Sequence, residues 1–150
     1  ELEFMLGKKN IKVLDRFEKD SFAYIKIEKR FYAKTYWDVF LKYLSANDFS
    51  IPEDVLNRDV TSDILPNQIV QNILLRIYKN SPMIAQLCEL MVDFDEGMQE
   101  WRYRHVKMVE RTIGAKMGTG GSEGVKYLQA TLFKPLFEDL WLIRSEFEND

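Results

Sequence analysis

The longest uninterrupted helical pattern in the sequence runs from Pro82 to about Met117, and it constrains the fold more than any other feature. Ser81 and Pro82 favour a helix start, because proline is tolerated in a first turn that does not need its missing N–H. Apolar side chains and one histidine then recur on one side at helical spacing: Leu87, Leu90, Met91, Phe94, Met98, Trp101, His105, Met108 and Thr112. At about 1.5 Å per residue this helix would be roughly 50 Å long. We expect it to be the central rod of an all-α helical bundle.

Shorter helices are expected before this rod. The opening residues read as helical turns closed by Gly7, with Lys8 and Lys9 near the negative end of the helix dipole. Thr35 can cap a helix from residue 36 to about 46. Two further helices are expected to begin near the prolines at 52 and 66. The second has an inward stripe formed by Ile69, Ile73, Leu74 and Ile77.

Other segments are less regular. Residues 12–20 predict a loop with a short helix. In Phe22–Phe31 apolar and charged residues alternate for part of the way, which admits a strand, although nothing nearby offers a strand to pair with. Beyond residue 124, Val125, Leu128 and Leu132 suggest one more helix. Pro135 ends that helix, and Leu136–Phe147 is expected to pack as the terminal helix.

Composition and charge exclude several classes of function. The chain has 150 residues, of which 46% are hydrophobic, so a single domain with one sizeable core is expected. A net charge of −3 gives no general attraction to nucleic acid or to an anionic membrane. No segment is apolar enough for a membrane span. The single cysteine, Cys88, reads as a buried hydrophobe that cannot form an internal disulfide, and a cytoplasmic compartment is the default.

His105 is the only histidine of the chain, and two interpretations of it compete. It lies on the apolar side of the long helix, four residues after Trp101 and three before Met108. It can be a packed core residue that hydrogen-bonds a carbonyl. It can also be the axial ligand of a haem iron, which needs only one protein ligand in an apolar slot. A zinc site is disfavoured because it requires three or four ligands, and the absence of a Cys-x-x-Cys-His motif means that any haem would bind non-covalently.

A glycine-rich segment follows the long helix, with four glycines between Gly118 and Gly124. It is not a phosphate-binding loop of the Walker type, because the sequence contains no Gly-Lys-Ser or Gly-Lys-Thr. It is not a dinucleotide fingerprint either, because Glu123 occupies the place of the last glycine and the segment follows a helix. Two interpretations remain: a mobile loop that carries hydroxyl groups, or a plain connection between helices.

Charged residues are distributed unevenly along the long helix. Acids come first, at Asp93, Asp95, Glu96 and Glu100, and bases come later, at Arg102, Arg104, Lys107, Arg111 and Lys116. This order complements the helix dipole, which is sufficient to explain it. Alternatively, some of the cations meet the propionates of a haem.

Four segments, spread over essentially the whole chain, resemble the tryptophan 2,3-dioxygenase family. Trp101–Lys116 followed by Gly118–Ser122 looks like the family's haem-ligand helix and substrate loop. Glu3–Asn10 resembles its Glu-Phe-Leu-Leu-Gly-Asn-Lys-Asn segment. Tyr36–Leu41 is similar to its Ser-Leu-Tyr-Asp helix, and Leu140–Arg144 to its C-terminal Leu-Trp-x-Leu-Arg.

The resemblance implies roles for five residues. His105 would be the proximal ligand of a non-covalent haem b, and Trp101 and Tyr127 would help to line the haem pocket. Thr119, with Gly120, would contact the amino acid part of the substrate as the loop closes. The implied reaction inserts both atoms of O2 across the C2–C3 bond of the indole ring of L-tryptophan, giving N-formylkynurenine, in tryptophan catabolism by the kynurenine pathway.

The resemblance also implies a larger assembly. This chain would be the C-terminal portion of a single all-helical haem dioxygenase domain, with the distal-pocket residues upstream of Glu1, so no catalytic residue is assigned within these 150. A cytoplasmic homotetramer with no nucleic-acid or membrane partner is expected.

Two departures from the family pattern leave alternatives open. Glu123 replaces a usual serine in the loop, and Ala115 stands where a larger residue is common. The carboxylate of Glu123 would weaken binding of a substrate that carries a carboxylate itself. The chain could therefore be a related haem enzyme that acts on another aromatic metabolite. A non-catalytic helical interaction module, with a merely packed His105, is the alternative from a different class.

Overall fold

The computed structural model describes residues 1–113, 129, 130 and 132–149, and no strand occurs in these ranges. The elements follow in the order α1 (Leu2–Met5), the 3-10 helix η1 (Ile11–Arg16), α2 (Phe22–Phe31), α3 (Tyr36–Ala46), α4 (Glu53–Leu56), α5 (Gln68–Asn80), α6 (Pro82–Ile113), α8 (Glu138–Leu142) and the 3-10 helix η2 (Ile143–Asn149). The expectation of an all-α fold is confirmed. No helix among the described residues combines the length and apolarity needed to cross a membrane.

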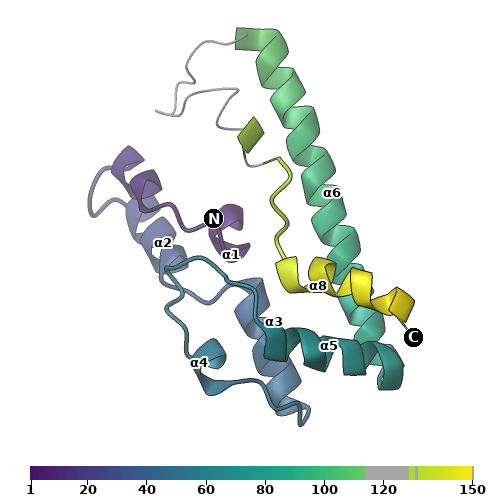
Figure 1. Cartoon of the computed structure of the whole chain (residues 1–150). Helices are drawn as coiled ribbons and strands as arrows, with labels where there is room; N and C mark the ends of the chain where they lie inside the picture. Colours follow the sequence, from purple (N-terminus) through teal and green to yellow (C-terminus); the bar gives the residue numbers. More distant parts are fainter. Residues whose placement is uncertain (114–128, 131, 150) are drawn as a thin grey trace.

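The long helix α6 runs along one edge of the fold, and α5 and α8 pack against its lower part in Figure 1. It begins at Pro82 as expected and is described as far as Ile113; residues 114–117 of the expected helix lie outside the described ranges. Helices α5 and α8 contact each other, and both contact α6 in its first half. Helices α1 and α2 and the helix η1 form a separate group beside them (Figure 1).

The main core lies where α3, α5, α8 and the first half of α6 meet. Its fully buried side chains are mostly aliphatic: Leu41, Leu44, Val70, Ile73, Leu74, Ile77, Cys88, Leu140 and Ile143. Removing such side chains from water is the main stabilising contribution, roughly 1.5–3 kcal/mol for each large aliphatic group. Cys88 is buried, as the sequence indicates.

Helix α3 has the predicted bounds, because its start is determined locally. The Thr35 hydroxyl accepts a hydrogen bond from the backbone N–H of Asp38, and the Asp38 carboxylate accepts one from the backbone N–H of Thr35. Both residues are buried. The guanidinium of Arg58 then donates to both oxygens of Asp38, at 2.6 and 2.8 Å, which ties the segment after α4 to this helix start.

The strand considered for Phe22–Phe31 is wrong, because this segment is helix α2. The Ser21 hydroxyl accepts from the backbone N–H of Tyr24 at its start. At its end the Lys9 ammonium donates to the carbonyls of Arg30, Phe31 and Ala33, at 3.1, 2.6 and 2.8 Å. Lys9 therefore binds the C-terminal carbonyls of α2, not those of the opening helix. Gly7 ends α1 as predicted, with a φ of +94°.

The terminal segment is helical but starts later than expected. Leu136 and Phe137 precede α8, and the regular structure runs from Glu138 to Asn149 as an α-helix followed by a 3-10 helix. On α5, Ile73, Leu74 and Ile77 are buried as predicted, but Ile69 is exposed and Val70 is buried in its place. Positions 70, 73, 74 and 77 form one straight stripe facing α6 and α8, and Ile69 lies beside it.

The face of α6 that packs inside is not the apolar stripe read from the sequence. The buried residues are Cys88, Val92, Asp95, Arg102 and Val106. Leu90, Trp101 and Met108 of the apolar stripe are more than half exposed. Met91, Met98 and His105 are half-buried. Hydrogen bonds of Asp95 and Arg102 to the segment before α8 fix which side faces inward, and this outweighs apolarity.

Candidate functional site

His105 and Trp101 lie together on the side of α6 that the described core leaves uncovered. Their rings are stacked, with centroids 5.2 Å apart and an angle of 5° between the planes. Trp101 is 56% exposed and His105 is half-buried. Among the described residues this stack is the one specific contact of the imidazole, and no hydrogen bond is made to its ring nitrogens.

The surroundings of this pair are mainly apolar. Met98 and Trp101 line a cavity of about 290 Å³ between α6 and α1, and Leu2, Phe4 and Val13 close it on the other side. Met108, one turn further along α6, is exposed on the same side as His105. Along its own helix His105 therefore lies between two apolar side chains, Trp101 and Met108.

The structure places only two of the five residues predicted for the site. Thr119, Gly120 and Tyr127 lie outside the described residues, as does Glu123. Their distances from His105 therefore stay predictions. Among the described residues no group of three or more histidine, cysteine or acidic side chains could hold a metal ion.

Three cations of α6 fall into two environments. Arg102 is buried, and its Nη1 donates to the carbonyl of Lys134 at 3.0 Å. Arg104 and Lys107 are exposed and form ion pairs along the helix, with Glu100 at 2.8 Å and Glu110 at 3.0 Å. The helix dipole and the spacing of three or four residues are sufficient to explain these two exposed ion pairs. Lys116 lies outside the described residues.

The sequence interpretation missed the most connected polar side chain, Asp95. Its carboxylate accepts hydrogen bonds from the backbone N–H groups of Leu136 and Phe137, from the indole Nε1 of Trp141 and from the amide of Gln99. It is completely buried. The available signal was spacing: Asp95 shares a helical face with Cys88, Val92 and Arg102, all at intervals of three, four or seven residues.

Comparison with known proteins gives consistent matches. The family model described as tryptophan 2,3-dioxygenase matches residues 53–147. A tryptophan 2,3-dioxygenase of Herpetosiphon aurantiacus is 47% identical over 146 residues, covering 97% of this chain and 55% of that protein. One of Anaeromyxobacter dehalogenans is 46% identical, covering 96% and 54%. One of Bacillus thuringiensis subsp. konkukian is 38% identical, covering 97% and 53%.

The chain spans about half the length of the curated relatives it matches. Within that half the match covers nearly every residue, at identities well above the level at which helical proteins resemble each other by composition alone. The segment that carries His105 and Trp101 lies inside the region matched by the family model. The chain therefore belongs to the tryptophan 2,3-dioxygenase family.

Proposed function

We propose that this chain forms one side of a haem pocket, with His105 as the proximal ligand of a non-covalent haem b. The observation that carries the proposal is the half-buried imidazole of His105, stacked on Trp101 and not hydrogen-bonded within the described residues. A single imidazole is a ligand that haem iron accepts from a protein. Bound haem would supply the iron centre at which O2 reacts.

The proposed reaction is that named for the relatives, the dioxygenation of tryptophan. In this reaction both atoms of O2 enter the indole C2–C3 bond of L-tryptophan, and N-formylkynurenine is formed. Thr119 and Gly120 would hold the amino acid part of the substrate, and Tyr127 would line the pocket with Trp101. Family membership and the glycine-rich composition around Thr119 support these roles.

The other side of the pocket requires residues beyond these 150. The proposed domain is the C-terminal portion of one all-helical dioxygenase domain, and the proposed assembly is a cytoplasmic homotetramer. The exposed apolar side chains of α6 support this assembly, because such a face is usually covered by other protein segments.

Haemin titration tests the ligand assignment. The protein is mixed with haemin, reduced, and its absorption recorded between 350 and about 650 nm, the range in which ligated haem absorbs. A sharp Soret band is expected for the wild type and its loss for His105→Ala. Lys107→Gln, which changes an exposed residue of the same helix, should retain the band. An unchanged spectrum in His105→Ala would remove this histidine from the metal site.

Steady-state kinetics test the loop. Thr119→Ala is expected to raise KM for L-tryptophan while the haem content per chain stays that of the wild type, because the hydroxyl contacts substrate and not haem. Wild-type kinetics in this variant would exclude Thr119 from the substrate site.

A further inference from the structure

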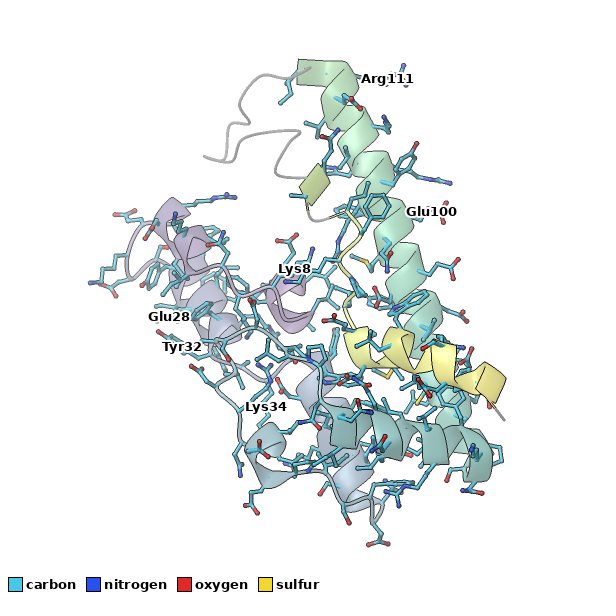
Figure 2. The ribbon with its side chains drawn as sticks, in the orientation of Figure 1. Lys8, Glu28, Tyr32, Lys34, Glu100 and Arg111 are labelled. Carbon is cyan, nitrogen blue, oxygen red and sulfur yellow. The ribbon has the colours of Figure 1, made fainter. Side chains whose placement is uncertain are left out.

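A cluster of cations lies where α1 and the segment before α8 approach α6. It consists of three cations, Lys8, Arg102 and Lys134. Lys8 and Lys134 line one cavity of about 250 Å³, and Arg102 is linked to the same place because it donates to the carbonyl of Lys134. Lys8, labelled in Figure 2, lies between α1 and the chain that leads into α8. Arg102 is buried and Lys8 is half-buried.

Within the described part of the chain, none of these three cations forms an ion pair with a carboxylate. The contrast with the next residue is clear, because the ammonium of Lys9 is satisfied by three carbonyls. The acids whose charge reaches Lys8 are Glu3 and Asp95, and the carboxylate of Asp95 already accepts from four other groups.

Burial and mutual repulsion act on this cluster in the same direction. Burial, with the charges of Arg102 and Lys134, lowers the pKa of Lys8 to about 8. Burial also lowers the pKa of Arg102. Asp63 and Glu138 line the same cavity as Lys8, but the charges with the largest effects on the pKa of Lys8 are those of Arg102, Glu3, Lys134 and Asp95. At Lys8 the repulsion from Arg102 and Lys134 outweighs the attraction of Glu3 and Asp95, so this end of the cavity is its positive end.

We propose that the recess at Lys8 binds a small oxyanion, a carboxylate or phosphate group, between the ammonium groups of Lys8 and Lys134, with Arg102 reinforcing the positive charge. Ammonium and guanidinium groups donate to such oxygens in short charge-assisted bonds. A bound anion would neutralise the repulsion that the folded chain otherwise retains. Its neighbours Asp63 and Glu138 restrict the site to a small group.

Two sources supply this chemistry. One is a free anion from solution. The other is a propionate of haem, since Arg102 also lines the cavity that contains Trp101 and Met98; this second source rests on the function proposed above. The first source does not depend on haem, so the two can be separated experimentally.

Isothermal titration with inorganic phosphate, on the haem-free protein at pH 7 and constant ionic strength, tests the site. One saturable site per chain is expected. Lys8→Gln should weaken phosphate binding at least tenfold, and Lys134→Gln should also weaken it. Lys34→Gln changes an exposed lysine, labelled in Figure 2, that does not line the recess, and this variant should bind phosphate as the wild type does. Absence of saturable binding in the wild type, or equal affinity in Lys8→Gln, would overturn the proposal.

Lys134 is exposed, so Lys134→Gln keeps the test decisive even if Lys8→Gln does not fold, which circular dichroism would reveal. Repeating the titration after haemin saturation distinguishes the sources. Retained phosphate binding identifies a free anion. Phosphate binding that is lost with haemin, together with faster haemin release from Lys8→Gln at an unchanged Soret position, identifies a propionate. Failure of haemin to bind would contradict the proposed function and leave the phosphate result intact.

Discussion

Asp95 shows how one buried charge can hold two distant segments together. Its carboxylate accepts from two consecutive backbone N–H groups, those of Leu136 and Phe137, at 2.9–3.0 Å. It also accepts from the indole of Trp141 at 2.9 Å. Hydrogen bonds to a charged acceptor contribute about 1.5–3 kcal/mol each when the alternative is an unpaired buried donor, and such bonds are not additive. Asp95 therefore anchors the segment before α8 against the middle of α6.

Asp95→Asn should lower the free energy of unfolding by about 3 kcal/mol, because an amide presents N–H groups to donors that need an acceptor. Urea denaturation followed by circular dichroism measures this value. Asp93→Asn, on the exposed side of the same helix, is the matched control and should change it by no more than about 0.5 kcal/mol. Equal stability of the two variants would show that the carboxylate of Asp95 is not an anchor.

The lowered pKa of Lys8 predicts that the free energy of unfolding increases with pH. Its pKa is about 8 in the folded chain against an ordinary value of 10.5, so between these values the unfolded state binds more protons. The destabilising contribution of the charged ammonium is complete below pH 8 and disappears as pH rises towards 10.5. The free energy of unfolding, measured as the difference from Lys8→Met, should therefore increase by about 1–2 kcal/mol over this window, allowing for solvent screening of a half-buried group.

Lys12→Met is the control for this titration, since Lys12 is exposed and should leave the pH profile of the wild type unchanged. A flat difference between wild type and Lys8→Met across the window would mean that Lys8 keeps its ordinary pKa. Phosphate bound in the recess should reduce the rise, because an anion favours the charged ammonium.

These residues mark what a sequence can reveal at this scale. His105 and Trp101 could be placed together in advance, because a separation of four residues determines their proximity within one helix. Asp95 and Arg102 could not, because their partners are backbone groups more than 30 residues away, at Leu136 and Lys134. Charged side chains are normally assigned to the solvent, and only the fold shows which of them it buries.

At the scale of elements, the ends of helices depend on contacts of different range. The bounds of α3 were predictable because Thr35 and Asp38 cap it from within four residues. Helix α2 was ambiguous because its last carbonyls are satisfied by Lys9, which lies 21 to 24 residues earlier. For α6 the length was readable from periodicity, but the inward face was not. The buried side contains two charged residues, Asp95 and Arg102, and the exposed side contains most of the large apolar groups.

Lys9→Met should loosen the end of α2. The substitution keeps the apolar stem of the side chain but leaves the carbonyls of Arg30, Phe31 and Ala33 without their donor. We expect a loss of about 1–2 kcal/mol in the free energy of unfolding, with faster amide exchange in the last turn of α2. Lys12→Met changes an exposed lysine of η1 that does not bind these carbonyls, and it should show neither change. Unaltered exchange in Lys9→Met would contradict a capping role.

On the scale of the whole molecule, the described packing is uneven along α6. The first half of the helix contributes to the main core with α3, α5 and α8. The second half is covered, within the described residues, by a small cluster of Val106, Leu132 and Val109. The uncovered side of this second half carries Trp101, His105 and Met108. Among the described residues, the part of α6 with the proposed ligand is therefore the part with the least tertiary support.

This asymmetry predicts how haem binding would change local stability. Amide hydrogens open most readily where few buried contacts hold a helix, so those of residues 103–113 should exchange faster than those of residues 84–95 in the haem-free protein. Ligation at His105 stabilises only the folded form of the helix, which links haem binding to exchange. Haemin should therefore slow exchange at residues 103–113 at least tenfold and leave residues 84–95 nearly unchanged.

Hydrogen exchange measured by mass spectrometry, with and without haemin, resolves these two segments. His105→Ala should remove the protection by haemin but keep the slow exchange of residues 84–95, since Cys88 and Val92 in the main core are not altered. Protection that persists in His105→Ala would mean that haemin binds by apolar contact alone, through Trp101 and Met98. Uniform exchange along α6 in the haem-free protein would mean that its second half is stabilised by more than the contacts of Val106 and Leu132. The predicted link between haem binding and local stability would then be contradicted.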